Sequence, residues 1–74
     1  MKKYIIFDTK NGDCFNEILN TDDKKKAVDI FRQTWAALSA HDQKQCEMFE
    51  LVYCEVDEDN IPDLETAEVI ETIR

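Results

Sequence analysis

The dipeptide Asn11-Gly12 is the feature that most restricts how this chain can fold. It lies between residues 4–7, a dense run of β-branched and aromatic residues, and residues 14–19, which form the expected returning strand. A two-residue type I′ turn needs positive φ at both central positions, and Asn-Gly is a pair that tolerates this well. The sequence therefore predicts a β-hairpin around this turn, in a register that places Ile5 opposite Ile18.

Residues 22–39 have the periodicity of an amphipathic helix. Large apolar residues recur at spacings of three, four and three, which places them on one helical face: Val28, Phe31, Trp35 and Leu38. This face is expected to pack in the core. The stretch Ser39-Ala40-His41-Asp42 is similar to a capping box, so the long helix is expected to break near Ser39.

The rest of the chain predicts one further strand and a final helix. Residues 47–56 alternate in the manner of a strand that is partly covered on both faces. A helix is then expected from Pro62 or Asp63 to Arg74, with its apolar stripe formed by Leu64, Ala67, Ile70 and Ile73. The expected fold is a single α/β domain of the α+β type over residues 1–74, in the order β-β-α-β-α. Its three-stranded antiparallel sheet, of order 2-1-3, packs against the long helix.

Composition points to a small domain in a reducing compartment. The 74 residues include one Gly and one Pro, so no linker is expected, and three cysteines are an odd number for a disulfide framework. No apolar run approaches the roughly 20 residues that span a bilayer, and the basic start is too short on apolar residues for a signal peptide. The expected location is the cytoplasm, without membrane contact.

No arrangement of residues predicts an enzyme, a catalytic residue or a bound cofactor. Gly12 is the only glycine and is needed in the hairpin turn, so a phosphate-binding glycine loop is excluded. The acidic stretch that starts at Asp57 fails as an EF-hand because Ile61 and Pro62 occupy positions that need an oxygen ligand and a glycine. One alternative hypothesis is a metal-binding or thiol-dependent protein, whose ligands would be Cys14, His41, Cys46 and Cys54. These residues lack the paired C-x₂-C spacing of common zinc sites.

The net charge of −8 is distributed unevenly along the chain. Residues 1–44 hold eight basic and seven acidic residues, a net charge of +1, whereas residues 45–74 hold one basic and ten acidic residues, a net charge of −9. The longest basic run, Lys24-Lys25-Lys26, follows Asp22-Asp23 directly. Direct binding to nucleic acid is therefore not expected, because the phosphate backbone attracts strongly basic surfaces.

The acidic C-terminal third predicts a non-enzymatic interaction module that docks a basic protein, with DNA mimicry or inhibition as a narrower form. The candidate partner-binding residues are Glu55, Asp57, Glu58, Asp59, Asp63, Glu65, Glu68 and Glu71. Two alternatives remain open. The carboxylates can form a solvated face that only keeps the protein soluble. They can also meet Lys24-Lys25-Lys26 of a second copy, so the choice between monomer and homodimer stays undecided.

Part of the chain resembles a loose class of short proteins. The pattern Trp35-x-x-Leu38-Ser39-x-x-Asp42-x-Lys44, followed by a strand and the acidic end Val56-Asp57-Glu58-Asp59, is similar to uncharacterised acidic proteins of phages and conjugative elements of Firmicutes. The resemblance covers about residues 31–60. It implies a small accessory protein and assigns no site residue. Small acidic inhibitors of host defence nucleases also come from such elements, which favours the docking hypothesis by association only.

Overall fold

The N-terminal hairpin forms as the Asn11-Gly12 turn predicts. In the computed structural model, which covers residues 1–74, β1 (Lys2–Lys10) pairs antiparallel with β2 (Asp13–Ile18). The register is the predicted one, with Ile5 opposite Ile18. Asn11 and Gly12 have φ of 53° and 83°, the left-handed values that a type I′ turn requires.

The predicted amphipathic helix is present but is shorter than residues 22–39. Helix α1 (Lys24–Ala37) begins after Asp23, whose side chain accepts a hydrogen bond from the backbone N–H of Lys25 at 2.9 Å. The break near Ser39 is confirmed, because Ser39 caps a second short helix, α2 (Ala40–Gln45). Neither helix combines the length and the apolar character needed to cross a membrane.

The third strand pairs with β1 on the side away from β2, so β1 lies between β2 and β3 as predicted. Strand β3 (Cys46–Glu55) runs antiparallel to β1, with Tyr4 opposite Tyr53. The first three strands therefore have the expected order 2-1-3.

The predicted C-terminal helix is wrong. The chain instead forms a short 3₁₀ turn, η1 (Leu64–Thr66), and a fourth strand, β4 (Glu68–Thr72), so the sheet order is β2-β1-β3-β4. Beyond β4, the N–H of Ile73 still donates to the carbonyl of Phe49 at 3.0 Å. Two causes favour the strand: residues 69–73 are rich in β-branched side chains, and the outer edge of β3 needs hydrogen-bond partners.

A register shift in β4 distributes its apolar residues over both faces of the sheet. Leu51 lies opposite Glu71 and Val52 lies opposite Val69, so Ile70 is an extra residue between the two pairs. Ile70 packs against the cluster beneath α1, whereas Val69 lines a hollow on the other face. The helical spacing of Leu64, Ala67, Ile70 and Ile73 is therefore coincidental.

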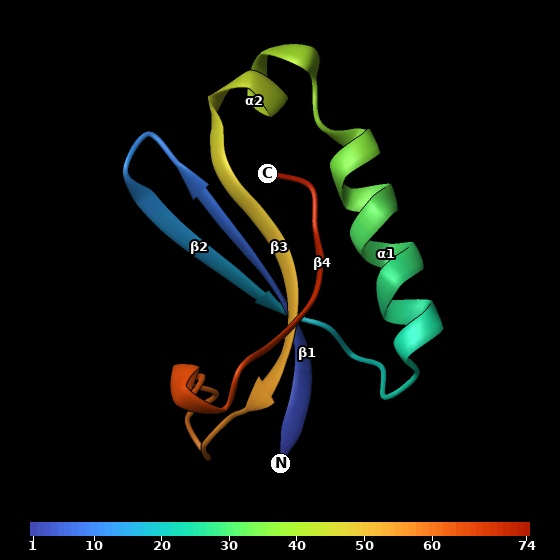
Figure 1. Ribbon diagram of the computed structural model, residues 1–74, viewed down its shortest axis with the longest axis vertical. Helices are drawn as coiled ribbons and strands as arrows, with labels where there is room; N and C mark the ends of the chain where they lie inside the picture. Colours follow the sequence, from blue (N-terminus) through green and yellow to red (C-terminus); the bar gives the residue numbers. More distant parts are fainter.

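The two faces of the sheet are covered unequally (Figure 1). We call the face beneath α1 the covered face. Its buried cluster comprises Tyr4, Ile6, Leu19, Ala27, Phe31, Phe49 and Leu51. The ring of Phe49 lies 5.0 Å from that of Phe31 and 5.1 Å from that of Trp35, which is partly buried there. We call the opposite side the open face. Its smaller buried cluster comprises Ile5, Val52, Cys54 and Val56.

Candidate interaction surface

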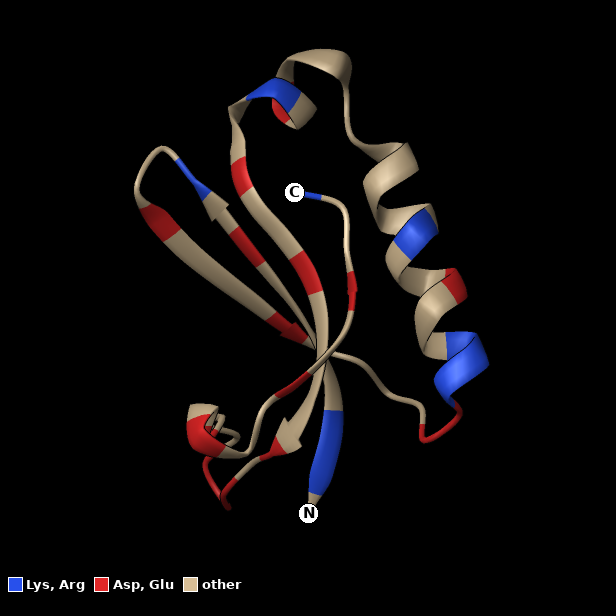
Figure 2. Ribbon diagram, viewed as in Figure 1, with Lys and Arg blue, Asp and Glu red and all other residues tan.

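The eight predicted partner-binding carboxylates do not form one helical face, because the helix that would have aligned them is absent. They are distributed over the end of β3, the following loop, η1 and β4. Figure 2 shows the acidic segments of that loop and of η1 gathered at one end of the sheet, near the N-terminus. The basic start of α1 lies apart from this end in the same view.

Half of these carboxylates already have partners inside the protein. Glu55 pairs with the N-terminal ammonium at 2.8 Å, and Glu71 accepts two hydrogen bonds from the Arg32 guanidinium at 2.8 and 2.9 Å. Asp57 accepts from two backbone N–H groups of its own loop, and Asp63 caps η1 through the N–H of Glu65. These four carboxylates are thus engaged in contacts within the fold.

The two ion-paired carboxyls are also held in their charged form. The hydrogen bond from the N-terminal ammonium lowers the pKa of Glu55, and that from the Arg32 guanidinium lowers the pKa of Glu71. In both cases partial desolvation opposes the shift. Because the side chain of Arg32 is 63% exposed, its pair with Glu71 is screened by solvent.

The other four predicted residues are free to meet a partner. They are exposed, and no ion pair or hydrogen bond involves their carboxylate oxygens: Glu58, Asp59, Glu65 and Glu68. All four lie in the segment that connects the end of β3 to the start of β4. The unpaired carboxylates of the C-terminal third thus lie within residues 58–68, and Glu68 lies opposite Tyr53 of the covered face.

The open face contains a groove with a volume of about 360 Å³, which we call the open-face groove. Residues of β1, β3 and β4 form its floor. Residues of β2 form one side, and Leu64 of η1 with Ala67 forms the other. Eight apolar residues line it: Phe7, Cys14, Phe15, Met48, Val52, Leu64, Ala67 and Val69. Three of them are among the most exposed large apolar side chains of the protein, namely Leu64 at 67%, Phe15 at 55% and Val69 at 55%.

The only charged residues among those that line the open-face groove are the two acids Asp8 and Glu50. Glu50 lies opposite Phe7 and Thr72 in the sheet, and its carboxylate is reached only by the Thr72 hydroxyl at 3.4 Å. That distance is long for a hydroxyl-to-carboxylate hydrogen bond. The groove thus combines an apolar lining with a half-buried residue, Glu50, whose carboxylate has no cationic partner.

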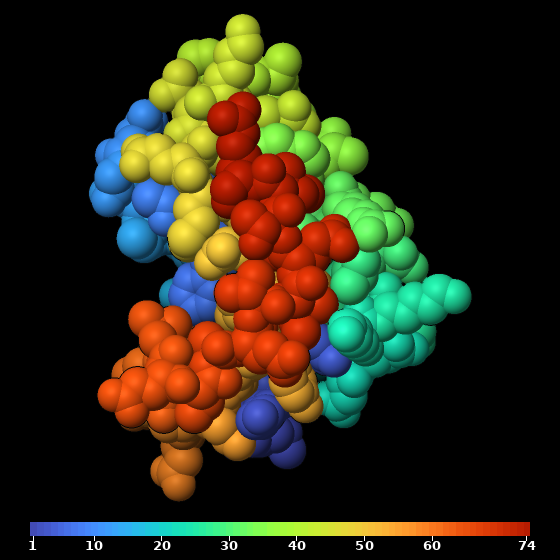
Figure 3. All heavy atoms as spheres, in the orientation of Figure 1, coloured from blue at the N-terminus to red at the C-terminus, as the bar shows by residue number.

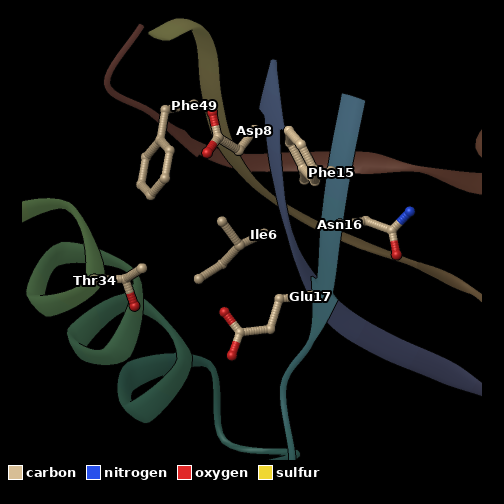
Figure 4. Close-up of a pocket in the computed structure, with 7 residues that line it drawn as sticks. All are labelled: Ile6, Asp8, Phe15, Asn16, Glu17, Thr34 and Phe49. Carbon is tan, nitrogen blue, oxygen red and sulfur yellow. The ribbon is translucent and has the colours of Figure 1, made fainter. Parts of the chain in front are cut away.

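A second hollow lies on the covered face between β2 and α1 (Figure 4). Ile6, Phe49 and Thr34 face into it together with the carboxylates of Asp8 and Glu17. Its volume of about 120 Å³ is smaller than the roughly 150 Å³ that holds a benzene molecule in an engineered cavity. The Asp8 carboxylate also accepts a hydrogen bond from the Cys46 thiol at 3.4 Å. This hollow is therefore much smaller than the open-face groove.

The four residues of the metal or thiol hypothesis are not brought together. Cys46 and Cys54 lie near the two ends of β3 and are buried, whereas Cys14 and His41 are exposed on β2 and α2. No group of three or more His, Cys, Asp or Glu residues is arranged to hold a metal ion. Burial raises the pKa of the Cys46 and Cys54 thiols, which makes both poor nucleophiles near neutral pH.

The basic cluster Lys24-Lys25-Lys26 is exposed at the start of α1. Asp23 and Asp29 lie with Lys24, Lys25 and Arg32 around a shallow depression there. The positive surface is therefore interrupted by carboxylates.

Comparison with protein-family models, curated proteins and solved structures gives no match. The open-face groove was not anticipated from the sequence, because it depends on β4 and η1, which the sequence assigned to a helix. The signal that could have revealed it is the β-branched run Val69-Ile70-Glu71-Thr72-Ile73.

Proposed function

We propose that this protein is a non-enzymatic interaction module that docks a basic protein through the acidic surface of its C-terminal third. The observation that supports this most is the separation of the predicted carboxylates into two groups. Four are used within the fold, and four are exposed without a partner in one connected segment: Glu58, Asp59, Glu65 and Glu68.

Charge of one sign in one segment speeds the encounter with an oppositely charged partner and makes it sensitive to salt. Nucleic-acid-binding proteins are the class of basic proteins with the most pronounced positive surfaces, so an inhibitor that imitates DNA is the narrowest form of the proposal. The protein would act in a reducing compartment such as the cytoplasm, which suits its three free cysteines.

The test is capture of partners by the immobilised protein at low and at high salt. We expect a basic protein to be retained at low salt and released at high salt. A variant in which Glu58, Asp59, Glu65 and Glu68 are replaced by Gln or Asn should lose it.

The matched control replaces four carboxylates elsewhere, Asp13, Glu17, Asp22 and Asp29, by Asn or Gln. This variant has the same net charge as the first and should keep the partner. Equal loss from both variants would show that only the total charge matters. Retention of no basic protein even at low salt would refute the proposal.

A further inference from the structure

The open-face groove leaves apolar surface exposed to solvent in a protein that can bury only a limited area on folding. A domain of this size buries only about 60% of the surface of its unfolded chain. Six large apolar residues are nevertheless exposed, and three of them, Phe15, Leu64 and Val69, line this groove, although Phe15 also lines the hollow on the covered face. Figure 3 shows the corresponding notch in the outline of the molecule, between the atoms of the N-terminal hairpin and those of η1. A clustered apolar surface with a polar rim is typical of a binding site.

Glu50 determines which kind of occupant the groove can accept. An apolar occupant would remove water from this carboxylate, and burial of an unpaired charge is costly. No basic residue of the chain lines the groove or pairs with Glu50. The occupant must therefore bring its own cation along with its apolar group.

The charged residues that line the groove or flank Leu64 have the same sign. Asp8 and Glu50 line it, and Leu64 lies between Asp63 and Glu65. Two open faces that met each other would place these carboxylates together, so a second copy of the chain is disfavoured as the occupant. A cationic segment would find opposite charge on the rim and on the floor.

We infer that the open-face groove binds a segment of a basic protein in which one or two large apolar side chains lie beside lysine or arginine. The apolar side chains fill the groove, and a cationic side chain pairs with Glu50. This inference rests on the proposed function and adds the chemistry by which the partner is recognised. In a volume of about 360 Å³ there is room for more than one ring-sized group.

The experiment uses two synthetic peptides of equal length and equal lysine content, one with leucine and the other with serine at the remaining positions. Their affinities for the full chain are measured by calorimetry at low salt. We expect the leucine–lysine peptide to bind roughly 10- to 100-fold more tightly, the effect of burying one large apolar side chain.

Two substitutions with a matched control test the location. Leu64→Ser should lower affinity for the leucine–lysine peptide about tenfold, whereas Ile61→Ser should leave it unchanged. Ile61 is also exposed in the same acidic segment but does not line the groove. Val69→Asp distinguishes the two modes of binding by the sign of its effect. The added negative charge would increase the affinity of a purely electrostatic complex, but would decrease it where an apolar side chain of the peptide fills the groove.

The role of Glu50 is tested by Glu50→Gln, with Asp29→Asn on α1 as a control that removes the same charge far from the groove. We expect a loss of affinity only with Glu50→Gln. Circular dichroism spectra identical to that of the unaltered protein show that each variant is folded.

The possible failures are distinguishable. If both peptides bind equally and the groove variants change nothing, the inference is wrong while docking of basic partners survives. If neither peptide binds at low salt, both proposals fail. If a lysine-free leucine–serine peptide binds as tightly, the groove takes an uncharged ligand and the inference is overturned. Reversible dimerisation that Val69→Asp abolishes would assign the groove to a second copy and would also overturn it.

Discussion

The covered and open faces of the sheet are built from the same strands but differ in what completes them. Beneath α1, the aromatic rings of Phe31, Trp35 and Phe49 close the apolar surface. On the other side, Ile5, Val52 and Cys54 are buried, yet the neighbouring groove stays open beside Leu64 and Val69. The difference suits the proposed division of tasks, in which the covered face stabilises the fold and the open face is the surface that we propose for binding.

The largest expected effect is on the covered face. Phe31→Ala removes a fully buried ring from the main cluster and should cost about 3–5 kcal/mol, a large part of the stability of so small a domain. Val69→Ala on the open face should cost less than about 1 kcal/mol. Urea unfolding followed by circular dichroism measures both. Equal costs would contradict the division between the faces.

Thiol reactivity tests which part of the open face is covered. Cys54 is 0% exposed, whereas Cys14 beside the groove is exposed. Burial raises the pKa of the Cys54 and Cys46 thiols, so at about pH 8 both should react with iodoacetamide far more slowly than Cys14.

Mass spectrometry should find label on Cys14 alone in the folded protein and on all three cysteines in urea. Equal labelling of Cys54 and Cys14 in the folded protein would mean that η1 and β4 do not lie where the structure places them.

A smaller effect on stability distinguishes the carboxylates that have partners within the fold from those that have none. Asp57 accepts hydrogen bonds from the N–H groups of Asp59 and Ile61 at 2.8 and 2.9 Å. Asp57→Ala should cost about 1–2 kcal/mol, and Asp57→Asn, which keeps an acceptor oxygen, should cost less. Glu58→Gln in the same loop should stay within roughly 0.5 kcal/mol of the unaltered protein. A change in this last variant as large as that in Asp57→Ala would contradict the distinction.

The smallest effect concerns pH. The Arg32 guanidinium lowers the pKa of Glu71, so the folded protein binds fewer protons at this site than the unfolded chain. The stability from this pair is full above the unfolded pKa of about 4.3 and is lost as the pH falls through the folded pKa.

Glu71→Gln should therefore flatten the acid side of the stability profile, and Glu68→Gln, an exposed carboxylate on the same strand, should not. High salt should reduce the difference because the pair is near the surface. An unchanged profile in Glu71→Gln would show that the ion pair does not contribute.

Local signals in the sequence were sufficient for the type and order of the elements in the first 56 residues, although helix α1 is shorter than the predicted residues 22–39. The Asn11-Gly12 turn determined the hairpin register, and the capping pattern at Ser39 located the break between helices. Both depend on residues only a few positions apart, where turn geometry and capping have specific residue preferences. The third strand followed from its alternation.

The C-terminal segment could not be predicted in the same way, because a long-range contact decides its structure. The spacing of Leu64, Ala67, Ile70 and Ile73 favours a helix, but pairing with the open edge of β3 selects a strand. The roles of the carboxylates depend on similar contacts. Glu71 is 39 positions from Arg32, and no local pattern marks it as paired while Glu68 stays free.

The most direct test of the open-face groove as a binding site is an NMR titration of the labelled protein with the leucine–lysine peptide. We expect backbone amide shifts at groove residues such as Phe7, Val52 and Val69, while the amides of Lys24–Ala37 in α1 stay unchanged. Shifts confined to the loop of residues 57–61, or centred on α1, would contradict the assignment of binding to the groove.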